Sequence, residues 1–232
     1  GYAKKKMVKH LWLFLEKSKM KKLYAIVPAR AGSKRVKNKN IIKIKKLMLI
    51  DYTINYLLKI NKVDKIIIST DIKKIINKYK KKKKILVIQR PKKISGDKSK
   101  SSDLVKHVLQ VLKKKKINPP KYFFLSQPTS PLRDVSDFNK SFKILLKSKA
   151  DSIFSACKAE GIFNPEVYYY KKKQSLKPLI KKDYLKKNKY IFRNGAIYIF
   201  STKSFEKKKT IYSNNSKIYL MPMSMSERLQ SY

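Results

Sequence analysis

The sequence predicts an α/β fold built on a mainly parallel sheet, and three observations support this prediction. The chain of 232 residues is long enough for one large domain with a small addition. From Lys22 onward, short apolar runs alternate with amphipathic stretches. The loops between them are short, which favours neighbouring parallel strands. In such a sheet the ligand site lies beyond the carboxyl ends of the strands.

The predicted elements follow in order along the chain. A first buried strand, Leu23–Val27, leads into a polar loop from Pro28 to Asn40. The next elements are a helix at Asp51–Lys59, a strand at Ile66–Ser69, a helix at Ile72–Tyr79, a strand at Ile85–Ile88, a helix that ends at Leu112 and a strand at Tyr122–Leu125. The last are a helix at Phe138–Leu146 and strands at Ser152–Ala156, Ala196–Phe200 and Ile218–Met221. Asp51, Asp71 and either Ser102 or Asp103 are the expected helix N-caps.

Residues 161–192 interrupt this alternation. They contain the apolar run Val167–Tyr170, a lysine run and few helical signals. We interpret the segment as an excursion from the main sheet and as an oligomerisation arm.

Composition argues against the class of protein that the charge first suggests. The formal net charge is +46, with 60 Lys and Arg against 14 Asp and Glu. Only six of these basic residues are arginine, and the lysines are spread along the whole chain. A nucleic-acid surface usually combines Arg with exposed aromatic residues. We therefore attribute the lysines to an AT-rich coding sequence and expect only salt-sensitive, non-specific binding to polyanions.

Cysteine and histidine are too scarce for several kinds of site. Cys157 is alone, so no intramolecular disulfide can form and a cytoplasmic, reducing location is expected. His10 and His107 are far apart in sequence, which leaves little for a zinc site or a His-dependent triad. No run approaches the roughly 18 apolar residues of a membrane span. Residues 1–19 are expected to be a leader outside the domain, which would then cover residues 20–232.

The loop after the first strand has the composition of a phosphate cradle. It reads Pro28-Ala-Arg-Ala-Gly-Ser-Lys-Arg35, followed by Lys39-Asn40. Gly32 lets the backbone approach a ligand, successive amides can bind an anion, and the cations supply charge. The spacing is neither that of a Walker loop nor that of the dinucleotide fingerprint. A merely solvated basic loop is the alternative.

Five segments together resemble the acylneuraminate cytidylyltransferases, the CMP-sialic acid synthetases, including the pseudaminic and legionaminic acid enzymes. The segments, in the order of that family, are Val27–Asn40, Ile68–Asp71, Arg90–Asp97, Gln127–Arg133 and Arg193–Tyr198. The resemblance implies a Rossmann-like three-layer sandwich of the nucleotide-diphospho-sugar transferase type, with residues 161–192 as a small dimerisation excursion of a homodimer. It implies transfer of CMP from CTP to the anomeric hydroxyl of a nonulosonate, with release of pyrophosphate and with Mg²⁺ as cofactor.

The resemblance also assigns roles to residues. Arg30 and Lys39 would be catalytic. The nucleotide would be bound by Arg30, Ala31, Gly32, Ser33, Lys39, Asn40, Arg90, Ser101 and Thr129. The sugar would be bound by Gln127 and Asn194.

The chain departs from the family pattern in two places. The basic, Gln-containing segment expected before Arg193 has no counterpart in Lys181–Lys187, which leaves the identity of the sugar open. The Asp-x-Asp pair expected to bind the metal would lie beyond Tyr232, so no metal ligand is assigned. We therefore expect a chain truncated at its C-terminus, which binds CTP and turns over poorly.

Three alternatives remain. The nearest is a cytidylyltransferase that acts on 3-deoxy-manno-octulosonate, although Arg193–Tyr198 fits the sialate branch better. A nucleic-acid-binding protein would show affinity that falls steeply with salt and no preference for CTP. The third is an inactive homologue kept as a binding module.

Overall fold

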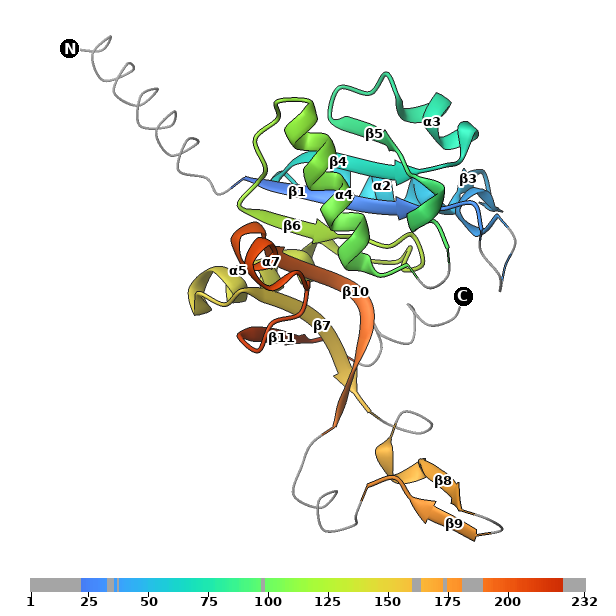
Figure 1. The fold of residues 1–232 in the computed structure, drawn as a ribbon, viewed down its shortest axis with the longest axis vertical. Coiled ribbons are helices and arrows are strands. Elements are labelled where there is room, and N and C mark those ends of the chain that lie inside the picture. The colour runs from blue at the N-terminus through green and yellow to red at the C-terminus, as the bar shows by residue number, and fades with distance from the viewer. Residues whose placement is uncertain are drawn as a thin grey trace, which may run out of the picture.

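The computed structural model describes residues 22–32, 36, 38–96, 99–159, 164–172, 175–180 and 190–222. Seven strands of these residues form one sheet in the order β11-β7-β10-β6-β1-β4-β5 (Figure 1). Their bounds are β1 Leu23–Ala29, β4 Val63–Thr70, β5 Ile85–Gln89, β6 Tyr122–Leu125, β7 Ser152–Lys158, β10 Ile191–Ser201 and β11 Ser216–Leu220. Neighbouring strands are parallel except where β10 runs against β6 and β7. The predicted mainly parallel sheet is confirmed.

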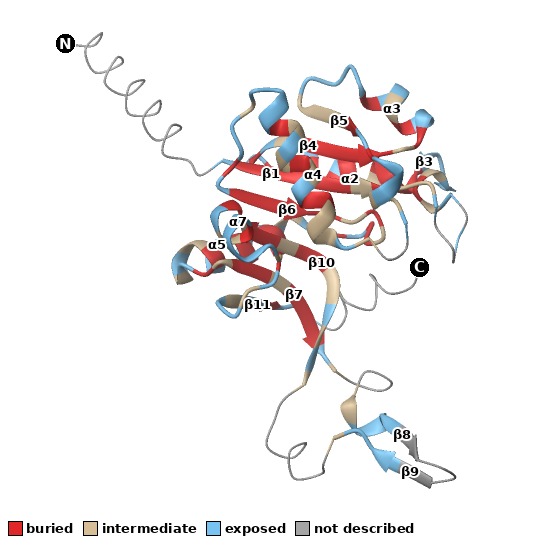
Figure 2. Cartoon of the chain, in the orientation of Figure 1, coloured by how far each residue is buried: buried red, intermediate tan, exposed pale blue. Residues whose placement is uncertain are grey.

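Helices cover both faces of this sheet. Their bounds are α2 Leu49–Leu58, α3 Lys73–Tyr79, α4 Ser101–Lys114, α5 Val135–Ser148 and α7 Thr202–Lys208. Side chains alternate across β1, so Ala25 packs in the cluster with α2, α3 and α5, whereas Ile26 packs in the cluster with α4 and α7. The buried residues lie along the strands and the inner helix surfaces (Figure 2). The predicted Rossmann-like three-layer sandwich is thus confirmed.

Of the three predicted helix caps, those of α2 and α4 are wrong in position. Asp51 is the third residue of α2, and its carboxylate accepts a hydrogen bond from the backbone N–H of Met48 at 3.0 Å. In α4 neither Ser102 nor Asp103 is the N-cap; Lys100 is, and Asp103 reaches back to its N–H at 3.2 Å. Both helices therefore begin earlier than predicted, with an acidic residue satisfying the first turn from within.

Several short elements complete the chain. They are η1 Lys39–Ile41, β2 Lys43–Ile44, β3 Leu47–Met48, η2 Lys92–Ile94, η4 Pro165–Val167, β8 Tyr169–Lys172 and β9 Ser175–Pro178. The β8–β9 hairpin lies away from the main sheet (Figure 1) and makes no strand pair with it. Helix α7 and the β2–β3 hairpin were not predicted, because such short elements show almost no periodicity. The expected leader, residues 1–19, lies outside the described residues.

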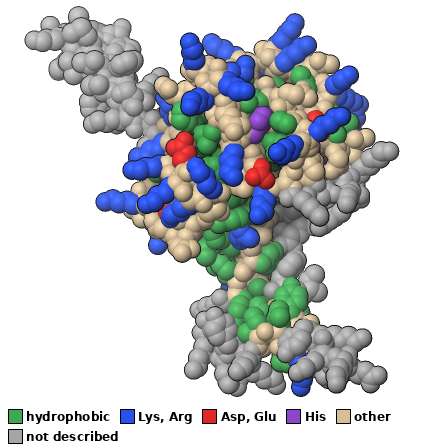
Figure 3. Space-filling view, viewed as in Figure 1, with side chains coloured by type: hydrophobic (Ala, Val, Ile, Leu, Met, Phe, Trp, Pro, Cys, Tyr) green, Lys and Arg blue, Asp and Glu red, His purple; other side chains and the backbone are tan. Residues whose placement is uncertain are grey.

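The surface shows no single basic stripe on the face seen in Figure 3, where lysines are scattered over the whole body. Among the helices that the structure describes, none is both long and apolar enough to span a lipid bilayer. Cys157 is buried in β7, as expected for a thiol in an apolar strand.

Candidate functional site

The topology of the sheet creates a cleft between β1 and β6. Strand β1 pairs with β4 as far as Ala29, but with β6 only as far as Ile26. Beyond Ile26 the two strands diverge at their carboxyl ends. Pro28 lies in this part of β1, where its missing N–H leaves no bond to β6 unmade. The strand order also reverses at β1, which is where open parallel sheets bind ligands.

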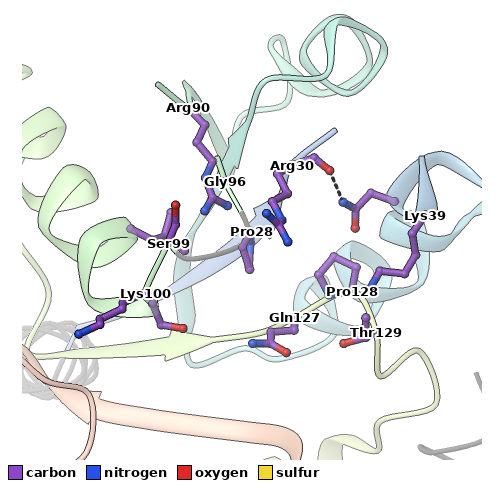
Figure 4. A pocket seen from close by; sticks show the side chains of 13 residues that line it. Pro28, Arg30, Lys39, Arg90, Gly96, Ser99, Lys100, Gln127, Pro128 and Thr129 are labelled. Carbon is purple, nitrogen blue, oxygen red and sulfur yellow. Dashed lines mark hydrogen bonds between the residues drawn. The ribbon is translucent and has the colours of Figure 1, made fainter. Parts of the chain in front are cut away.

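The first part of the cleft is a cavity of about 250 Å³, here named the basic compartment. It is lined by Pro28, Arg30, Lys39, Asn40, Arg90, Gly96, Ser99, Lys100, Ser101, Leu104, Gln127, Pro128 and Thr129. In Figure 4, Arg30 and Arg90 reach toward the same end of the cavity, with Gln127 and Thr129 opposite. The compartment thus collects residues from three of the five segments singled out in the sequence.

Two guanidinium groups shape one end of the basic compartment. Arg30 donates through Nη1 to the carbonyl of Ser95 at 3.0 Å, and Arg90 donates through Nε to the carbonyl of Ile94 at 3.0 Å. Both arginines therefore hold the loop after β5. Burial, and then the neighbouring charge of Arg30, lower the pKa of Arg90. Two cations in one partly buried pocket favour the binding of an anion between them.

The short helix η1 places Lys39 and Asn40. Asn38 takes the left-handed conformation (φ 55°), which Asn tolerates better than most residues, and starts this turn. Asn40 is buried, and its Nδ2 donates to the carbonyl of Arg30 at 2.9 Å, the dashed line in Figure 4. This bond ties the end of the predicted cradle to its beginning, while Lys39 lines the cleft.

The middle of the cradle is described only in part. The N–H of Ala31 donates to the carboxylate of Asp71 at 2.8 Å, so this amide already has a partner. Asp71 is therefore a support of the loop, and the prediction that it caps α3 is wrong; Ile72 is the N-cap. Among the described residues other than its chain neighbours, no atom lies within 4 Å of a Cβ built on Gly32, which leaves room for a ligand to approach this backbone. Ser33, Lys34 and Arg35 lie outside the described residues, as does Asp97.

The start of α4 forms another wall that the sequence indicated only through Ser101. Ser99 and Lys100 line the basic compartment beside it. A helix of 14 residues presents partial positive charge at its first turn, which adds to the field of the arginines. The polar run Lys98–Ser102, at the start of an amphipathic helix, was the sequence feature from which this wall could have been predicted.

The second part of the cleft is a larger cavity of about 590 Å³, here named the amide compartment. It is lined by Val36, Lys39, Ile42, Ile44, Leu49, Gln127, Thr129, Ser130, Asn194 and Gly195. Lys39, Gln127 and Thr129 line both compartments, so they form the common wall. Asn194 lines only the amide compartment, whereas Arg90 and Ser101 line only the basic one.

Asn194 belongs to a bulge in β10. The register between β10 and β7 shifts between Arg193 and Tyr198, and Gly195 has φ +78°, a conformation that favours glycine. The guanidinium of Arg193 is stacked on the ring of Tyr212, with 4.1 Å from Cζ to the ring centroid. Arg193 is absent from the lining of both compartments, although it belongs to the same segment as Asn194.

Arg133 links two segments that line the amide compartment, the bulge of β10 and the segment that begins at Gln127. Its Nε donates to the carbonyl of Ala196 at 2.7 Å, and its Nη2 donates to the carbonyl of Gln127. Its Nη1 lies 3.4 Å from Thr53 Oγ1 on α2. Burial lowers the pKa of Arg133 to about 10, which still leaves it protonated at neutral pH. The sequence placed Arg133 in the Gln127–Arg133 segment but gave it no role.

The described residues do not form a metal site. Within the described ranges, no three His, Cys, Asp or Glu side chains come together in a way that could hold a metal ion. Asp71, the acidic residue nearest to the cradle in the hydrogen-bond network, is engaged with Ala31. Among the described residues, no set of side chains is therefore assigned to Mg²⁺.

Comparisons with known proteins agree with this geometry. A family described as cytidylyltransferase matches residues 24–229. The chain is 29% identical over 211 residues to the N-acylneuraminate cytidylyltransferase of Escherichia coli O18:K1:H7. It is 29% identical over 217 residues to the CMP-N,N'-diacetyllegionaminic acid synthase of Legionella pneumophila, covering 86% of this chain and 87% of that protein.

The chain spans about half the length of the E. coli relative, since the match covers 86% of this chain and 47% of that protein. Among solved structures, a CMP:2-keto-3-deoxy-manno-octonic acid synthetase complexed with CTP matches with a TM-score of 0.61 and 14% identity. That match covers 86% of this chain and 90% of the other, and it shows a shared fold.

Proposed function

The chain belongs to the cytidylyltransferase family, and we propose that it transfers CMP from CTP to the anomeric hydroxyl of a sialic-acid-like nonulosonate. One observation carries the proposal: a basic compartment and an amide compartment share the wall formed by Lys39, Gln127 and Thr129. A nucleotide in the first would bring its α-phosphate to this wall, next to a sugar in the second. The two reactants would then meet inside one cleft.

The basic compartment suits the triphosphate and the cytidine. Arg30 and Lys39 supply charge at the loop after β1, and the backbone around Gly32 is accessible to a ligand. Arg90 and Ser101 line the basic compartment and not the amide compartment, which suits contact with the nucleoside. The predicted assignment of Ser33 to the nucleotide is kept as part of the proposal. The assignment of Asn40 to the nucleotide is also kept, since Asn40 lines the basic compartment while its Nδ2 donates to the Arg30 carbonyl.

The reaction needs few covalent contributions from the protein. The anomeric oxygen of the sugar would attack the α-phosphorus, a new P–O bond would form, and the bond to the β-phosphate would break. The hydroxyl proton is lost to solvent, and pyrophosphate carries away the negative charge of the leaving group. Arg30 and Lys39 would stabilise this charge as it develops, because fixed cations need no reorganisation during the step.

Dependence on Mg²⁺ is proposed from the resemblance and not from a protein site. A divalent cation commonly accompanies a nucleoside triphosphate and neutralises its phosphates. If it does so here, a chelator should abolish pyrophosphate release, and added Mg²⁺ should restore it.

A homodimer through residues 161–192 is proposed on the exposure of apolar side chains. Val167, Tyr168, Tyr169 and Leu179 are 43–59% exposed on the arm. Figure 3 shows hydrophobic side chains gathered there, unlike the lysine-covered body. Tyr170 and Leu176, also apolar, lie in β8 and β9, although their side chains are not described. Light scattering at moderate salt should report a dimer, and a monomer well above micromolar concentration would contradict this.

The proposed function is tested by identifying the product. The chain is incubated with Mg²⁺ and CTP, and in parallel with ATP, GTP or UTP, together with N-acetylneuraminate, a legionaminate or 3-deoxy-manno-octulosonate. Mass spectrometry should find a CMP-sugar only with CTP and a nonulosonate. A CMP adduct of 3-deoxy-manno-octulosonate alone would assign the other sugar, and no nucleotide preference would contradict the proposal. Arg30→Ala is the matched variant expected to lose product.

A further inference from the structure

Ser155 occupies the place in β7 that faces the bulge of β10, and it is fully buried. The strands lie side by side (Figure 1), but their register shifts between Arg193 and Tyr198. A bulge takes backbone groups out of the regular ladder. Here the N–H of Ile197 finds its acceptor in the side chain of Ser155, with 2.9 Å from the nitrogen to Oγ.

The direction of each hydrogen bond follows from that contact. Ile197 N–H can only donate, so Ser155 Oγ is the acceptor and keeps its own hydrogen for another partner. That partner is Oδ1 of Asn194, 2.6 Å away. The same Oδ1 also lies 3.3 Å from the backbone N–H of Ala196, a second group that can only donate. Because the Ala196 N–H can only donate, it identifies this atom as the amide oxygen, and the Ser155 hydroxyl then donates to the same oxygen.

The Asn194 NH₂ group must therefore face the other way. Its protein contact is the sulfur of Met221, 3.1 Å from Nδ2. A thioether is a weak acceptor, so this contact would yield readily to an oxygen. Asn194 also lines the amide compartment with Gly195, Gln127 and Thr129. The hydrogen bonds from Ser155 and Ala196 engage the amide oxygen of Asn194. Its NH₂ group, and not its oxygen, is therefore available to a ligand in the amide compartment.

We propose that Ser155 is a positioning residue that fixes the Asn194 amide as a hydrogen-bond donor to the acceptor sugar. The group it selects is an oxygen acceptor, either the carboxylate or an amide carbonyl of the sugar. A sugar that presents only an N–H group or an apolar group at this point leaves the Asn194 donor without an acceptor, which costs affinity. This inference rests on the proposed function for the identity of the sugar, but not for the orientation of the amide.

The competing explanation is that Ser155 serves the backbone alone, by satisfying Ile197. Both roles would make Ser155→Ala destabilising, so loss of stability does not separate them. They differ in whether the effect of Ser155 passes through Asn194. A double-mutant cycle on sugar recognition measures that dependence directly.

The experiment compares the wild-type chain with Ser155→Ala, Asn194→Ala and the double variant, with Ser152→Ala as a control. Ser152 is a buried serine on the same strand whose hydroxyl bonds Ser216, at the far end of β7 from the bulge. We expect Ser155→Ala to raise the KM of the sugar about tenfold with the KM of CTP unchanged. In the Asn194→Ala background, adding Ser155→Ala should raise the KM of the sugar by less than about a further twofold. Ser152→Ala should leave both constants unchanged.

A second readout does not depend on turnover. In ¹⁵N-labelled protein, the side-chain NH₂ resonances of Asn194 are those missing from Asn194→Ala. They should shift in Ser155→Ala and stay unchanged in Ser152→Ala. Unchanged resonances in Ser155→Ala, or fully additive effects on the sugar KM, would overturn the inference. If the chain uses 3-deoxy-manno-octulosonate, the proposed nonulosonate substrate is wrong. The double-mutant cycle is then measured with that sugar, and the resonance test of the Asn194 orientation still applies.

Discussion

The two compartments of the cleft handle their ligands by different physical means. The basic compartment is surrounded by fixed cations, of which Arg30 and Arg90 are held by carbonyls of the loop after β5. The amide compartment is larger and is lined by aliphatic side chains together with amide and hydroxyl groups. Among the described residues that line it, only Lys39 is cationic, and it belongs to the common wall. Under the proposed function, one compartment would neutralise the charge of the nucleotide, and the other would select the shape and hydrogen-bond pattern of the sugar.

The difference also reflects how each compartment is built. The basic compartment follows from strand divergence at a topological switch point, which the order of strands imposes. The amide compartment depends on a local irregularity, the bulge at Asn194 and Gly195, and on the buried groups that hold it. Nucleotide binding should therefore resist changes in β10, while sugar recognition should not.

The largest effect on stability and sugar recognition is expected from Arg133→Met, because Arg133 links the bulge of β10 to the segment that begins at Gln127. The change leaves the carbonyls of Ala196 and Gln127 buried without their donor, which should lower the free energy of unfolding by about 2–4 kcal/mol. The KM of the sugar should rise with it, and the KM of CTP less so, since Gln127 belongs to the common wall. Chemical denaturation and steady-state kinetics measure these changes.

Arg133→Lys is the matched control, because it keeps the charge but lacks the rigid planar fork of N–H donors that spans the two carbonyls. It should resemble Arg133→Met more than the wild-type chain. Full retention of stability and sugar KM in Arg133→Lys would show that the link between the two segments is unimportant.

Arg30→Ala should act on the nucleotide alone. Loss of its charge-assisted contacts should weaken CTP binding by about 1–3 kcal/mol. Arg30→Lys keeps one cation and should lose less. Calorimetry at physiological salt tests this, since lower salt would exaggerate the non-specific attraction of a chain with net charge +46. Unchanged CTP affinity in Arg30→Ala would remove the cradle assignment.

How much the sequence predicted differs between the two compartments. The segments Val27–Asn40 and Gln127–Arg133 each follow a buried strand, so parallel pairing was enough to bring them together. The contacts of Ser155 and Met221 with Asn194 could not be predicted from the sequence. They depend on the register of a bulge in β10, and no sequence pattern indicates that register. The cap at Asp51 was misplaced because burial of Leu49 starts α2 two residues earlier than the polar pattern indicates.

The smallest effect is expected from Asp151→Asn, at the amino end of β7 and away from both compartments. A hydrogen bond from Lys208, and then one from Ser213, lower the pKa of the Asp151 carboxyl. A lowered pKa contributes stability above the ordinary value of about 3.9 and loses it as the pH falls. The wild-type advantage over Asp151→Asn, under about 1 kcal/mol at pH 7, should therefore shrink below about pH 4. Both KM values should stay unchanged, and an altered KM would break the division between the two compartments.

The division is tested most directly by measuring both Michaelis constants in Asn194→Asp. The change keeps the size of the side chain, removes its donor and adds a negative charge to the amide compartment. We expect the KM of the nonulosonate to rise about tenfold or more while the KM of CTP stays within about twofold of the wild-type value. A rise in the KM of CTP with an unchanged KM of the sugar would contradict this expectation.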